Sequence, residues 1–185
     1  MRIRQALPDE LAAINAVHHA CGRQDWDATV LSDPGALFVA VALVDDTIVG
    51  AGKTHFQAEP ERGAPAGYYL GGVSVHPDHR RRGVGFGLTR ARIDWVWERS
   101  DTVYYFTDDT NVASMRLHAS FGFTEIARLP PSSARRRATK ASYSFALGGA
   151  VPMCRPEQFS GCWHADRPIA VEYQGRCSGR SLPRL

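Results

Sequence analysis

The sequence has little cysteine and almost no lysine. Its 185 residues include four cysteines, and no two of them are spaced as a C-x-x-C pair. Zinc sites usually show two closely spaced pairs of ligands, whereas this chain has one irregular group near its end, in which His164 follows Cys162 by two residues. We therefore expect no metal site, and we predict that the thiols are unpaired and reduced.

Long apolar runs are also missing. The longest uncharged stretch, residues 63–77, has 15 residues and contains four glycines and two prolines, whereas a membrane-spanning helix needs about 20 apolar residues. The first residues, MRIRQALPDEL, lack the apolar segment of a secretory signal. These absences predict no membrane association and a cytoplasmic location.

The composition, 44% apolar and 22% charged, is that of an ordinary globular protein, and the length suits one domain with a tail. Residues 1–127 hold 12 Lys and Arg against 16 Asp and Glu, a net charge of −4, and residues 128–185 hold 10 against 3, a net charge of +7. We predict a domain over residues 1–147 and a basic, cysteine-containing tail over residues 148–185, whose structure the sequence does not indicate. A solvated tail is the favoured interpretation, and nucleic acid is not an expected partner.

Helical and strand periodicities alternate along the predicted domain. Asp45 and Asp46 form a two-residue connection between two predicted strands, which fits a hairpin turn. The paired glycines Gly71 and Gly72 indicate a bulge within a strand. The order of elements predicts an α/β domain with a mixed sheet. Helices are expected over residues 8–21, 83–99 and 111–120, and strands over residues 1–7, 36–44, 47–56, 67–76, 102–107, 123–129 and 141–147.

Residues 73–88 carry the strongest chemical signal, because a strand is followed by three arginines and then by glycines that open a helix. A helix N-terminus presents unpaired N–H groups and a partial positive charge, so it binds anions. Gly83 and Gly85 leave room where a phosphate would press against the backbone. Arg80, Arg81 and Arg82 place positive charge at the same end, which is unfavourable without a nearby anion. This pattern predicts a phosphate-bearing ligand.

Two common phosphate-binding motifs fit this segment poorly. A P-loop ends in Gly-Lys-Ser/Thr, and residues 83–86 (GVGF) contain neither the lysine nor the hydroxyl. A dinucleotide-binding loop has its third glycine where this chain has Leu88, and it follows its strand directly, whereas residues 76–82 intervene here.

The sequence resembles the GNAT superfamily of acyl-CoA-dependent N-acyltransferases. The family signature V-x-V-x-P followed by R-x-x-G-x-G matches residues 73–77 (VSVHP) and 80–85 (RRRGVG). The second motif, an asparagine-led helix ending in Gly-Phe, matches residues 111–123 (NVASMRLHASFGF). The resemblance covers residues 1–147. It implies a mixed, mostly antiparallel central sheet that contains a splayed pair of strands and is flanked by helices, with Gly71 and Gly72 at the bulge.

The resemblance also implies acetyl-CoA as a co-substrate. The backbone of the strand before the loop would contact the pantetheine arm, and backbone N–H groups of the loop and helix start would hold the pyrophosphate. The asparagine at the start of the second motif would lie near the pantetheine. The implied cofactor-binding residues are Val73, Ser74, Val75, Arg80, Arg81, Arg82, Gly83, Val84, Gly85, Phe86, Asn111 and Ser114.

The implied reaction is direct attack of a primary amine on the thioester, and its acid and base are only partly assigned. Family members commonly use a tyrosine as the catalytic acid at the position where this chain has His118, which makes His118 the candidate acid. The alternative is a histidine on the helix surface that bonds to a neighbour. The glutamate base of many members has no counterpart in residues 68–75. The candidate replacements, each with a solvated loop acid as the alternative, are Asp25, Asp27, Asp108 and Asp109.

The acceptor is expected to bind between the loops at residues 23–35 and 57–66, whose acids and Trp26 suit a cationic amine. We predict a small-molecule amine, of the aminoglycoside kind. A protein N-terminus or lysine is the second choice of acceptor. A non-catalytic module that binds acyl-CoA is the alternative function, and a homodimer is compatible with the sequence. The acids in these loops are Asp25, Asp27, Glu59 and Glu61.

Overall fold

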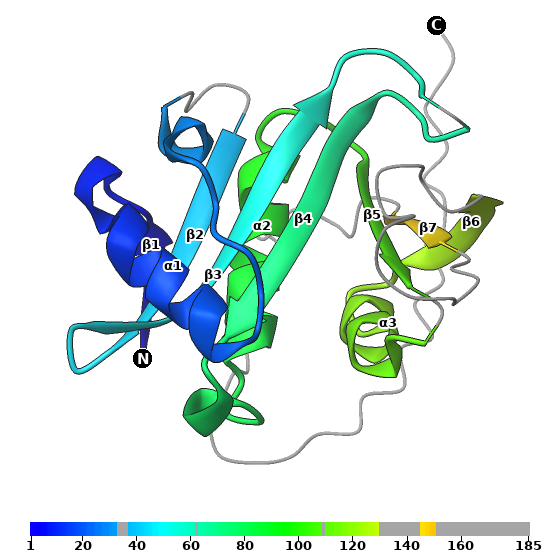
Figure 1. The fold of residues 1–185 in the computed structure, drawn as a ribbon. Coiled ribbons are helices and arrows are strands. Elements are labelled where there is room, and N and C mark those ends of the chain that lie inside the picture. Colours follow the sequence, from blue (N-terminus) through cyan, green and yellow to red (C-terminus); the bar gives the residue numbers. More distant parts are fainter. Residues whose placement is uncertain (33–36, 62, 109, 130–144, 151–185) are drawn as a thin grey trace, which may run out of the picture. The chain divides into compact units, whose positions relative to one another are not determined.

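The computed structural model of the chain describes residues 1–32, 37–61, 63–108, 110–129 and 145–150. These residues lie within one compact unit, Met1–Met153, and form a seven-stranded sheet flanked by helices (Figure 1). Within these ranges no helix is both long enough and apolar enough to cross a membrane. The predictions for the end of the tail concern residues outside the described ones.

The first half of the domain is a three-stranded antiparallel sheet with one helix. It consists of β1 (Arg2–Gln5), α1 (Leu11–Ala20), β2 (Leu37–Val44) and β3 (Thr47–Gln57). A 3₁₀ turn at Pro8–Glu10 leads into α1, and the Glu10 carboxylate accepts a hydrogen bond from the Leu7 N–H. Asp45 and Asp46 both have positive φ, 48° and 59°. This is the turn whose twist matches a two-residue hairpin, so the turn between the two predicted strands is confirmed.

The second half holds the segments that resemble the family motifs. It consists of β4 (Gly67–Val75), α2 (Val84–Trp97), β5 (Val103–Asp108), α3 (Val112–Ala119), β6 (Thr124–Leu129) and β7 (Phe145–Ala150). Asn111 begins α3, because its side-chain oxygen accepts a hydrogen bond from the Ser114 N–H at 3.2 Å. Gly122 follows the helix with φ 79°, as its left-handed position requires. The last predicted strand is present as β7 from Phe145, and residues 141–144 of its predicted range lie outside the described residues.

The strands lie in the order β1-β2-β3-β4-β5-β7-β6, and every pair among the described strands is antiparallel except β4 and β5. Figure 1 shows α1 on one face of the sheet and α2 on the other. The predicted fold class is therefore confirmed.

The bulge predicted at Gly71 and Gly72 is also present. Gly52 pairs with Val73 and Thr54 with Leu70, so two residues of β4 stand opposite one residue of β3. The extra residue reverses the alternation of side chains. Before the bulge Leu70 packs on the α2 side, and after it Val73 does so.

Beside this bulge the parallel pairing of β4 and β5 stops. The last pair is Leu70 with Tyr105, and from Phe106 onward β5 is paired only with β7 in the described residues. We call the unpaired ends of the two strands, residues 71–75 and 106–108, the wedge. This is the splayed strand pair that the resemblance to the family implies.

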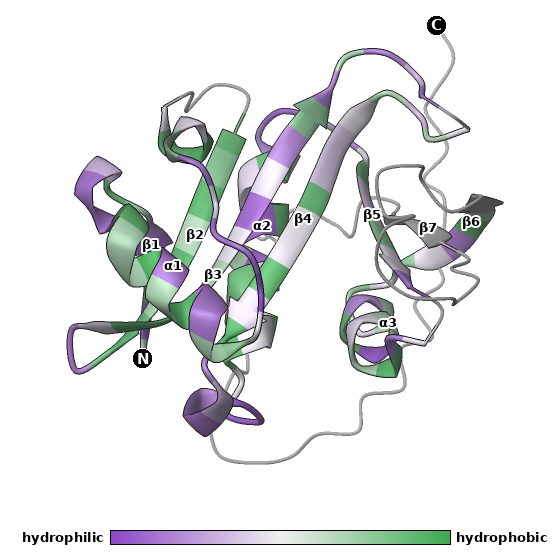
Figure 2. Cartoon of the chain, in the orientation of Figure 1, coloured by the Kyte–Doolittle hydropathy of each residue, from purple (hydrophilic) through white to green (hydrophobic). Residues whose placement is uncertain are grey.

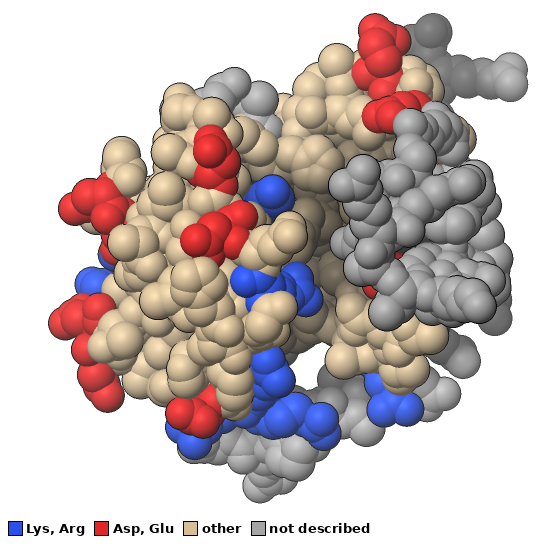
Figure 3. Space-filling model, viewed as in Figure 1, with Lys and Arg blue, Asp and Glu red and all other residues tan. Residues whose placement is uncertain are grey.

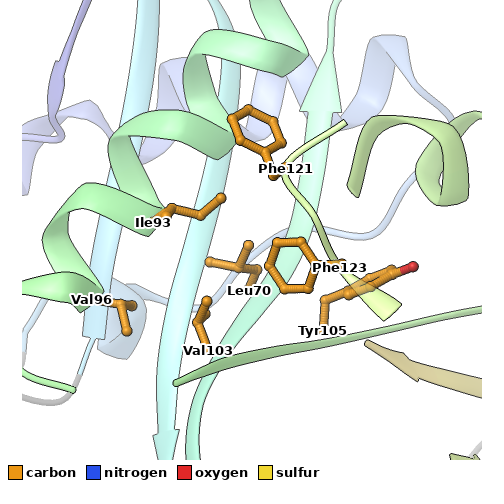
Figure 4. Close-up of a cluster of buried hydrophobic side chains, with 7 residues drawn as sticks. All are labelled: Leu70, Ile93, Val96, Val103, Tyr105, Phe121 and Phe123. Carbon is orange, nitrogen blue, oxygen red and sulfur yellow. The ribbon is translucent and has the colours of Figure 1, made fainter. Parts of the chain in front are cut away.

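An apolar cluster joins α2 to the strands on both sides of the wedge. Phe121 and Phe123, which follow α3, point toward the side chains of α2 and β4 in Figure 4. Burial of such side chains contributes about 1.5–3 kcal/mol each, so this cluster fixes α2 and the segment after α3 against the sheet. Figure 2 shows hydrophobic colour along β2, whereas β3 and β4 change between hydrophobic, neutral and hydrophilic colour along their length. The cluster consists of Leu70, Ile93, Val96, Val103, Tyr105, Phe121 and Phe123.

Candidate cofactor and active site

The loop from β4 to α2 turns sharply and ends in an open helix start. Arg81 and Gly83 both adopt positive φ, 61° and 78°. The first intrahelical bond runs from the Gly87 N–H to the Gly83 carbonyl at 2.9 Å. The N–H groups of Val84, Gly85 and Phe86 therefore have no acceptor within the helix. This end of α2 presents a row of backbone donors with a partial positive charge.

The two glycines of this loop serve different purposes. A Cβ on Gly83 would have no atom within 4 Å, so glycine is favoured there by its positive φ and not by a lack of space. A Cβ on Gly85 would meet only Leu117 at 3.8 Å and Val75 at 4.0 Å, which are ordinary contacts. Within the protein itself, alanine therefore fits at position 85.

The three arginines of the loop differ in their contacts. Arg80 folds back, so that its Nε donates to the Val75 carbonyl at 3.1 Å and its guanidinium lies 3.6 Å from the Cys21 sulfur. Arg81 and Arg82 are exposed. Phe86, also exposed, stacks on Phe121 with ring centroids 4.5 Å apart. Two guanidinium groups thus remain beside the helix start.

On β4, the backbone of Val73 and Val75 faces the wedge. The His76 N–H donates to the Val49 carbonyl of β3 at 2.8 Å. Hydrogen-bonding direction alternates along an antiparallel strand, so Ser74 also bonds toward β3, and its side chain is 3% exposed. The backbone N–H and C=O groups of Val73 and Val75 therefore point the other way, toward β5. The Val75 carbonyl is already used by Arg80 and Cys21, which leaves the Val75 N–H and both backbone groups of Val73 at the edge of the wedge.

His118 is buried and neutral. Its side chain is 6% exposed, and its Nδ1 lies 2.8 Å from the Ser114 carbonyl, to which it donates, and 3.3 Å from the Ser114 hydroxyl. Burial lowers the pKa of His118 to about 4, the bond to Ser114 opposes this shift, and the charge of Arg92 adds to it. Nε2 is buried with no hydrogen-bond partner among the described residues.

The alternative of a surface histidine at position 118 is therefore wrong. A role for His118 as an acid stays a prediction, and the low pKa weighs against it, because a neutral ring has no spare proton to give near pH 7.

The candidate bases in the loop after α1 are already engaged. Asp25 forms an ion pair with His19 at 2.5 Å, and Asp27 accepts a hydrogen bond from the Thr29 N–H at 3.0 Å and so caps a 3₁₀ turn. Asp108 ends β5, and it too takes part in an interaction within the protein. Asp109 lies outside the described residues. Base roles for these four acids remain untested predictions.

Arg92 of α2 is a buried cation that the sequence analysis missed. It is 0% exposed, and it donates to the carbonyls of Leu88, Lys53 and Gly71 and to the Thr89 hydroxyl at 2.9–3.1 Å. Burial lowers the pKa of Arg92 to about 9, so the guanidinium is still charged near pH 7. Its bonds to Lys53 and Gly71 hold the bulge from the α2 side. The stripe Val84, Leu88, Val96, which includes position 92 at four-residue spacing, is the signal that could have found it.

A second missed group lies on the α1 side of the bulge. His55 stacks on Tyr69 with ring centroids 5.6 Å apart, and its Nδ1 lies 3.5 Å from where a Cβ on Gly71 would be. Burial, and then the charge of Lys53, lower the pKa of His55. Lys53 and His55 alternate with buried residues on β3, so the two-residue period was the available signal. In the part of the chain that the structure describes, no three His, Cys, Asp or Glu residues are grouped to hold a metal ion.

Comparison with known proteins agrees with this geometry. Residues 4–123 match the model of the acetyltransferase (GNAT) family. The chain belongs to this family.

Among relatives, it is 37% identical over 95 residues to a mycothiol acetyltransferase of Thermobispora bispora, which covers 50% of this chain and 31% of the relative. It is 34% identical over 98 residues to aminoglycoside N(6′)-acetyltransferase type 1 of Klebsiella aerogenes, which covers 52% of this chain and 64% of that protein. The chain thus spans about a third of the mycothiol acetyltransferase and under two thirds of the other.

Solved structures of other acetyltransferases share the fold. Ribosomal-protein-alanine N-acetyltransferase from Brucella melitensis superposes with a TM-score of 0.62 at 22% identity, covering 82% of this chain and 100% of that one. A putative acetyltransferase from Salmonella typhimurium, solved with its cofactor acetyl-CoA, superposes with a TM-score of 0.60 at 22% identity, covering 81% and 92%.

Proposed function

We propose that this member of the GNAT family transfers the acetyl group of acetyl-CoA to a primary amine of a small molecule. One observation carries the proposal: the backbone donors at the start of α2, which have no acceptor within the helix, adjoin the end of β4, whose Val73 and Val75 backbone groups face the wedge. A diphosphate fits the first feature and an amide-containing chain fits the second. Two comparisons support the proposal: the Salmonella typhimurium structure contains acetyl-CoA, and two relatives are named as acetyltransferases of the small molecules mycothiol and aminoglycoside.

In this proposal the chain binds acetyl-CoA mainly through its backbone. The N–H groups from Arg81 to Phe86 would hold the pyrophosphate, and the side chains of Arg81 and Arg82 would add charge. Val73 and Val75 would pair with the amides of the pantetheine arm, while Ser74 keeps β4 in register with β3. We also propose contacts to acetyl-CoA from Arg80, Asn111 and Ser114. Each would use atoms other than those that form the hydrogen bonds described above.

Acetyl-CoA would supply the acetyl thioester: the amine nitrogen forms a bond to the acetyl carbon, the carbon–sulfur bond breaks, and the amine proton balances the charge of the departing thiolate. An alkyl ammonium has a pKa near 10.4, so the enzyme must take up a proton. We assign this step to His55, because its imidazole is neutral, has no carboxylate partner among the described residues and lies against Gly71 at the bulge. A thiolate of pKa about 8.5 leaves with little help from an acid.

Two other functions stay open beside this one. A protein N-terminus or lysine is the second candidate acceptor, supported by the fold shared with the Brucella melitensis enzyme. A module that binds acyl-CoA without catalysis is the third, supported by the missing glutamate on β4.

The first experiment is calorimetric titration of the full chain with acetyl-CoA and with NAD at about physiological ionic strength. The proposal expects binding of acetyl-CoA and no response to NAD. Release of the CoA thiol with amines then distinguishes an enzyme from a binding module. A folded sample that does not bind acetyl-CoA would overturn the proposal, and binding without turnover of any small or peptide amine would favour the binding module.

A further inference from the structure

The α1 side of the wedge carries a lysine that lies directly on the bulge. The Cγ of Lys53 is 3.0 Å from the position of a Cβ on Gly71. Its Nζ continues to Trp26 and lies 5.1 Å from the centre of that ring. Partial burial lowers the pKa of Lys53, because removal of water disfavours the charged form. A half-buried ammonium group thus stands beside the place where the proposed thioester would arrive.

A second cation approaches the other glycine of the bulge from a different element. Arg23 follows α1, and its backbone N–H donates to the His18 carbonyl at 2.9 Å. One nitrogen of its guanidinium lies 3.5 Å from the position of a Cβ on Gly72. The side chain is otherwise exposed. Lys53 and Arg23 therefore reach Gly71 and Gly72 from β3 and from the loop after α1.

The charge of Lys53 acts on both histidines on this face, and that of Arg23 acts on His18. Burial is the first cause that lowers the pKa of His18 and that of His55, and Lys53 lowers both further, while Arg23 acts on His18. Two of the described acids lie near this face. Asp25 contacts His19 and raises the pKa of His18, but the net shift of that pKa is still downward. Asp108 takes part in another interaction within the protein.

Lys53 and Arg23 take part in none of the ion pairs formed among the described residues. Figure 3 shows blue Lys and Arg atoms along the left wall of a hollow in the molecule. Red Asp and Glu atoms lie beside them in the same view, so the positive charge at the bulge rests on Lys53 and Arg23 themselves, which have no ion-pair partner among the described residues.

We propose that the acceptor amine also carries an anionic group, a carboxylate or a phosphate, which binds Lys53 and Arg23. This inference rests on the proposed acetyl transfer. An anion held at the bulge fixes the amine near the thioester, since both groups then belong to one small molecule. The two cations also lower the pKa of the bound amine, because a like charge disfavours its protonated form. A polycation such as an aminoglycoside would place further ammonium groups against Lys53 and Arg23, which costs binding energy.

Matched pairs of amines test the proposal, with release of the CoA thiol from acetyl-CoA as the measurement. L-phenylalanine is compared with L-phenylalaninamide, glucosamine 6-phosphate with glucosamine, and kanamycin is tested alone. We expect the anionic member of at least one pair to be acetylated with a kcat/KM about tenfold higher or more, and kanamycin to be poor. The first pair identifies a carboxylate and the second a phosphate. A preference for the neutral member in both pairs, or for kanamycin, overturns the proposal.

Variants show whether the two cations cause the preference. Lys53→Met and Arg23→Met should reduce the ratio within the preferred pair to about threefold or less, with acetyl-CoA affinity unchanged. Arg2→Met is the matched control, because Arg2 pairs with Asp46 on an exposed surface at the other edge of the sheet. A ratio that persists in both variants overturns the proposal. Thermal unfolding checks that each variant is folded.

A binding measurement covers the case in which none of these amines is acetylated. The full chain loaded with CoA is titrated with the product-like pair N-acetyl-L-phenylalanine and N-acetyl-L-phenylalaninamide, and with N-acetylglucosamine 6-phosphate and N-acetylglucosamine. Tighter binding of an anionic member in the native chain than in Lys53→Met supports the proposal, and equal binding in every pair overturns it. Failure of acetyl-CoA itself to bind would instead overturn the proposed function.

Discussion

The imidazole of His118 stacks on the phenol ring of Tyr105, with ring centroids 3.7 Å apart and planes 5° from parallel. Phe123 meets the same imidazole edge-on at 5.3 Å. This aromatic contact joins α3 to β5, and it lies on the β5 side of the wedge. The contact buries both ring nitrogens of His118, and among the described residues only Nδ1 has a partner, the backbone and side chain of Ser114.

Replacement of this ring by an apolar one tests its role. In His118→Phe the aromatic stack is kept, the unpartnered Nε2 is removed and the bond from Nδ1 to Ser114 is lost, and the gain and the loss are of similar size, about 1 kcal/mol each. We expect a free energy of unfolding within about 1 kcal/mol of the native value, measured by denaturant titration, and acetyl transfer within about threefold. If kcat instead falls more than about tenfold with unchanged acetyl-CoA affinity, a ring nitrogen takes part in the reaction, as the resemblance to the family implies.

The low pKa of His118 also predicts an acid-sensitive fold. A base whose pKa is lower in the folded state binds fewer protons there than in the unfolded chain, so the free energy of unfolding falls as the pH drops from about 6.5 toward the folded value of about 4. At pH 5 this one group would cost about 2 kcal/mol relative to pH 7.5. Denaturant titrations at both pH values measure the loss.

The variant His118→Phe isolates this contribution from that of the carboxylates and the other histidines. Its loss of stability between the same two pH values should be smaller than that of the native chain by about 2 kcal/mol. An identical loss in both proteins would show that His118 titrates normally when folded.

The proposed diphosphate site can be tested where the protein leaves room. In Gly85→Ala the added methyl meets only ordinary contacts, and alanine stabilises a helix by about 1 kcal/mol over glycine. The fold should therefore be as stable as before or more so. A diphosphate held against the backbone would meet the methyl, so we expect acetyl-CoA to bind at least about tenfold more weakly. Thermal unfolding and calorimetry measure the two effects.

Glu98→Ala, at the exposed far end of α2, is the control for this substitution. It should leave acetyl-CoA affinity unchanged. Equal affinity in Gly85→Ala and the native chain would remove the reason for placing the diphosphate at this helix start.

Most of the fold could be predicted because its boundaries are set by local signals. The Asp45–Asp46 turn, the Asn111 cap and the positive φ of Gly122 depend on residue types that act over a few positions. The bulge at Gly71 and Gly72 belongs to the same class, since paired glycines weaken a strand where they stand. β7 extends to Ala150, beyond the predicted end at residue 147, because the two glycines Gly148 and Gly149 indicate the end of a strand.

The residues around the bulge could be predicted only in part. Gly83 and Gly85 lie within the motif and the helix start, so their role follows from the sequence. Lys53 and Arg92 act on Gly71 from a neighbouring strand and from a helix, and such a meeting depends on register and packing. Arg92 stands on the buried stripe of α2, and the sequence shows no partner for its charge, whereas the structure surrounds it with carbonyl oxygens.

The last prediction concerns the base proposed for the amine. His55 on β3 is faced by Lys53 of its own strand, by Tyr69 of β4 and by Phe106 of β5. His55→Gln keeps a polar side chain of similar size but removes the basic nitrogen. If His55 accepts the proton, acetylation of the best amine should slow about 100-fold or more, with acetyl-CoA affinity unchanged.

The pH dependence separates a base from a structural residue. Because the pKa of His55 lies below its ordinary value, kcat/KM of the native chain should lose activity only below about pH 6.5, as the imidazole becomes protonated. This limb should be absent in His55→Gln. His79→Gln, in the turn after β4, is the control and should keep both the rate and the limb. A limb that survives in His55→Gln would transfer the role to another group, and an unchanged rate would end the assignment.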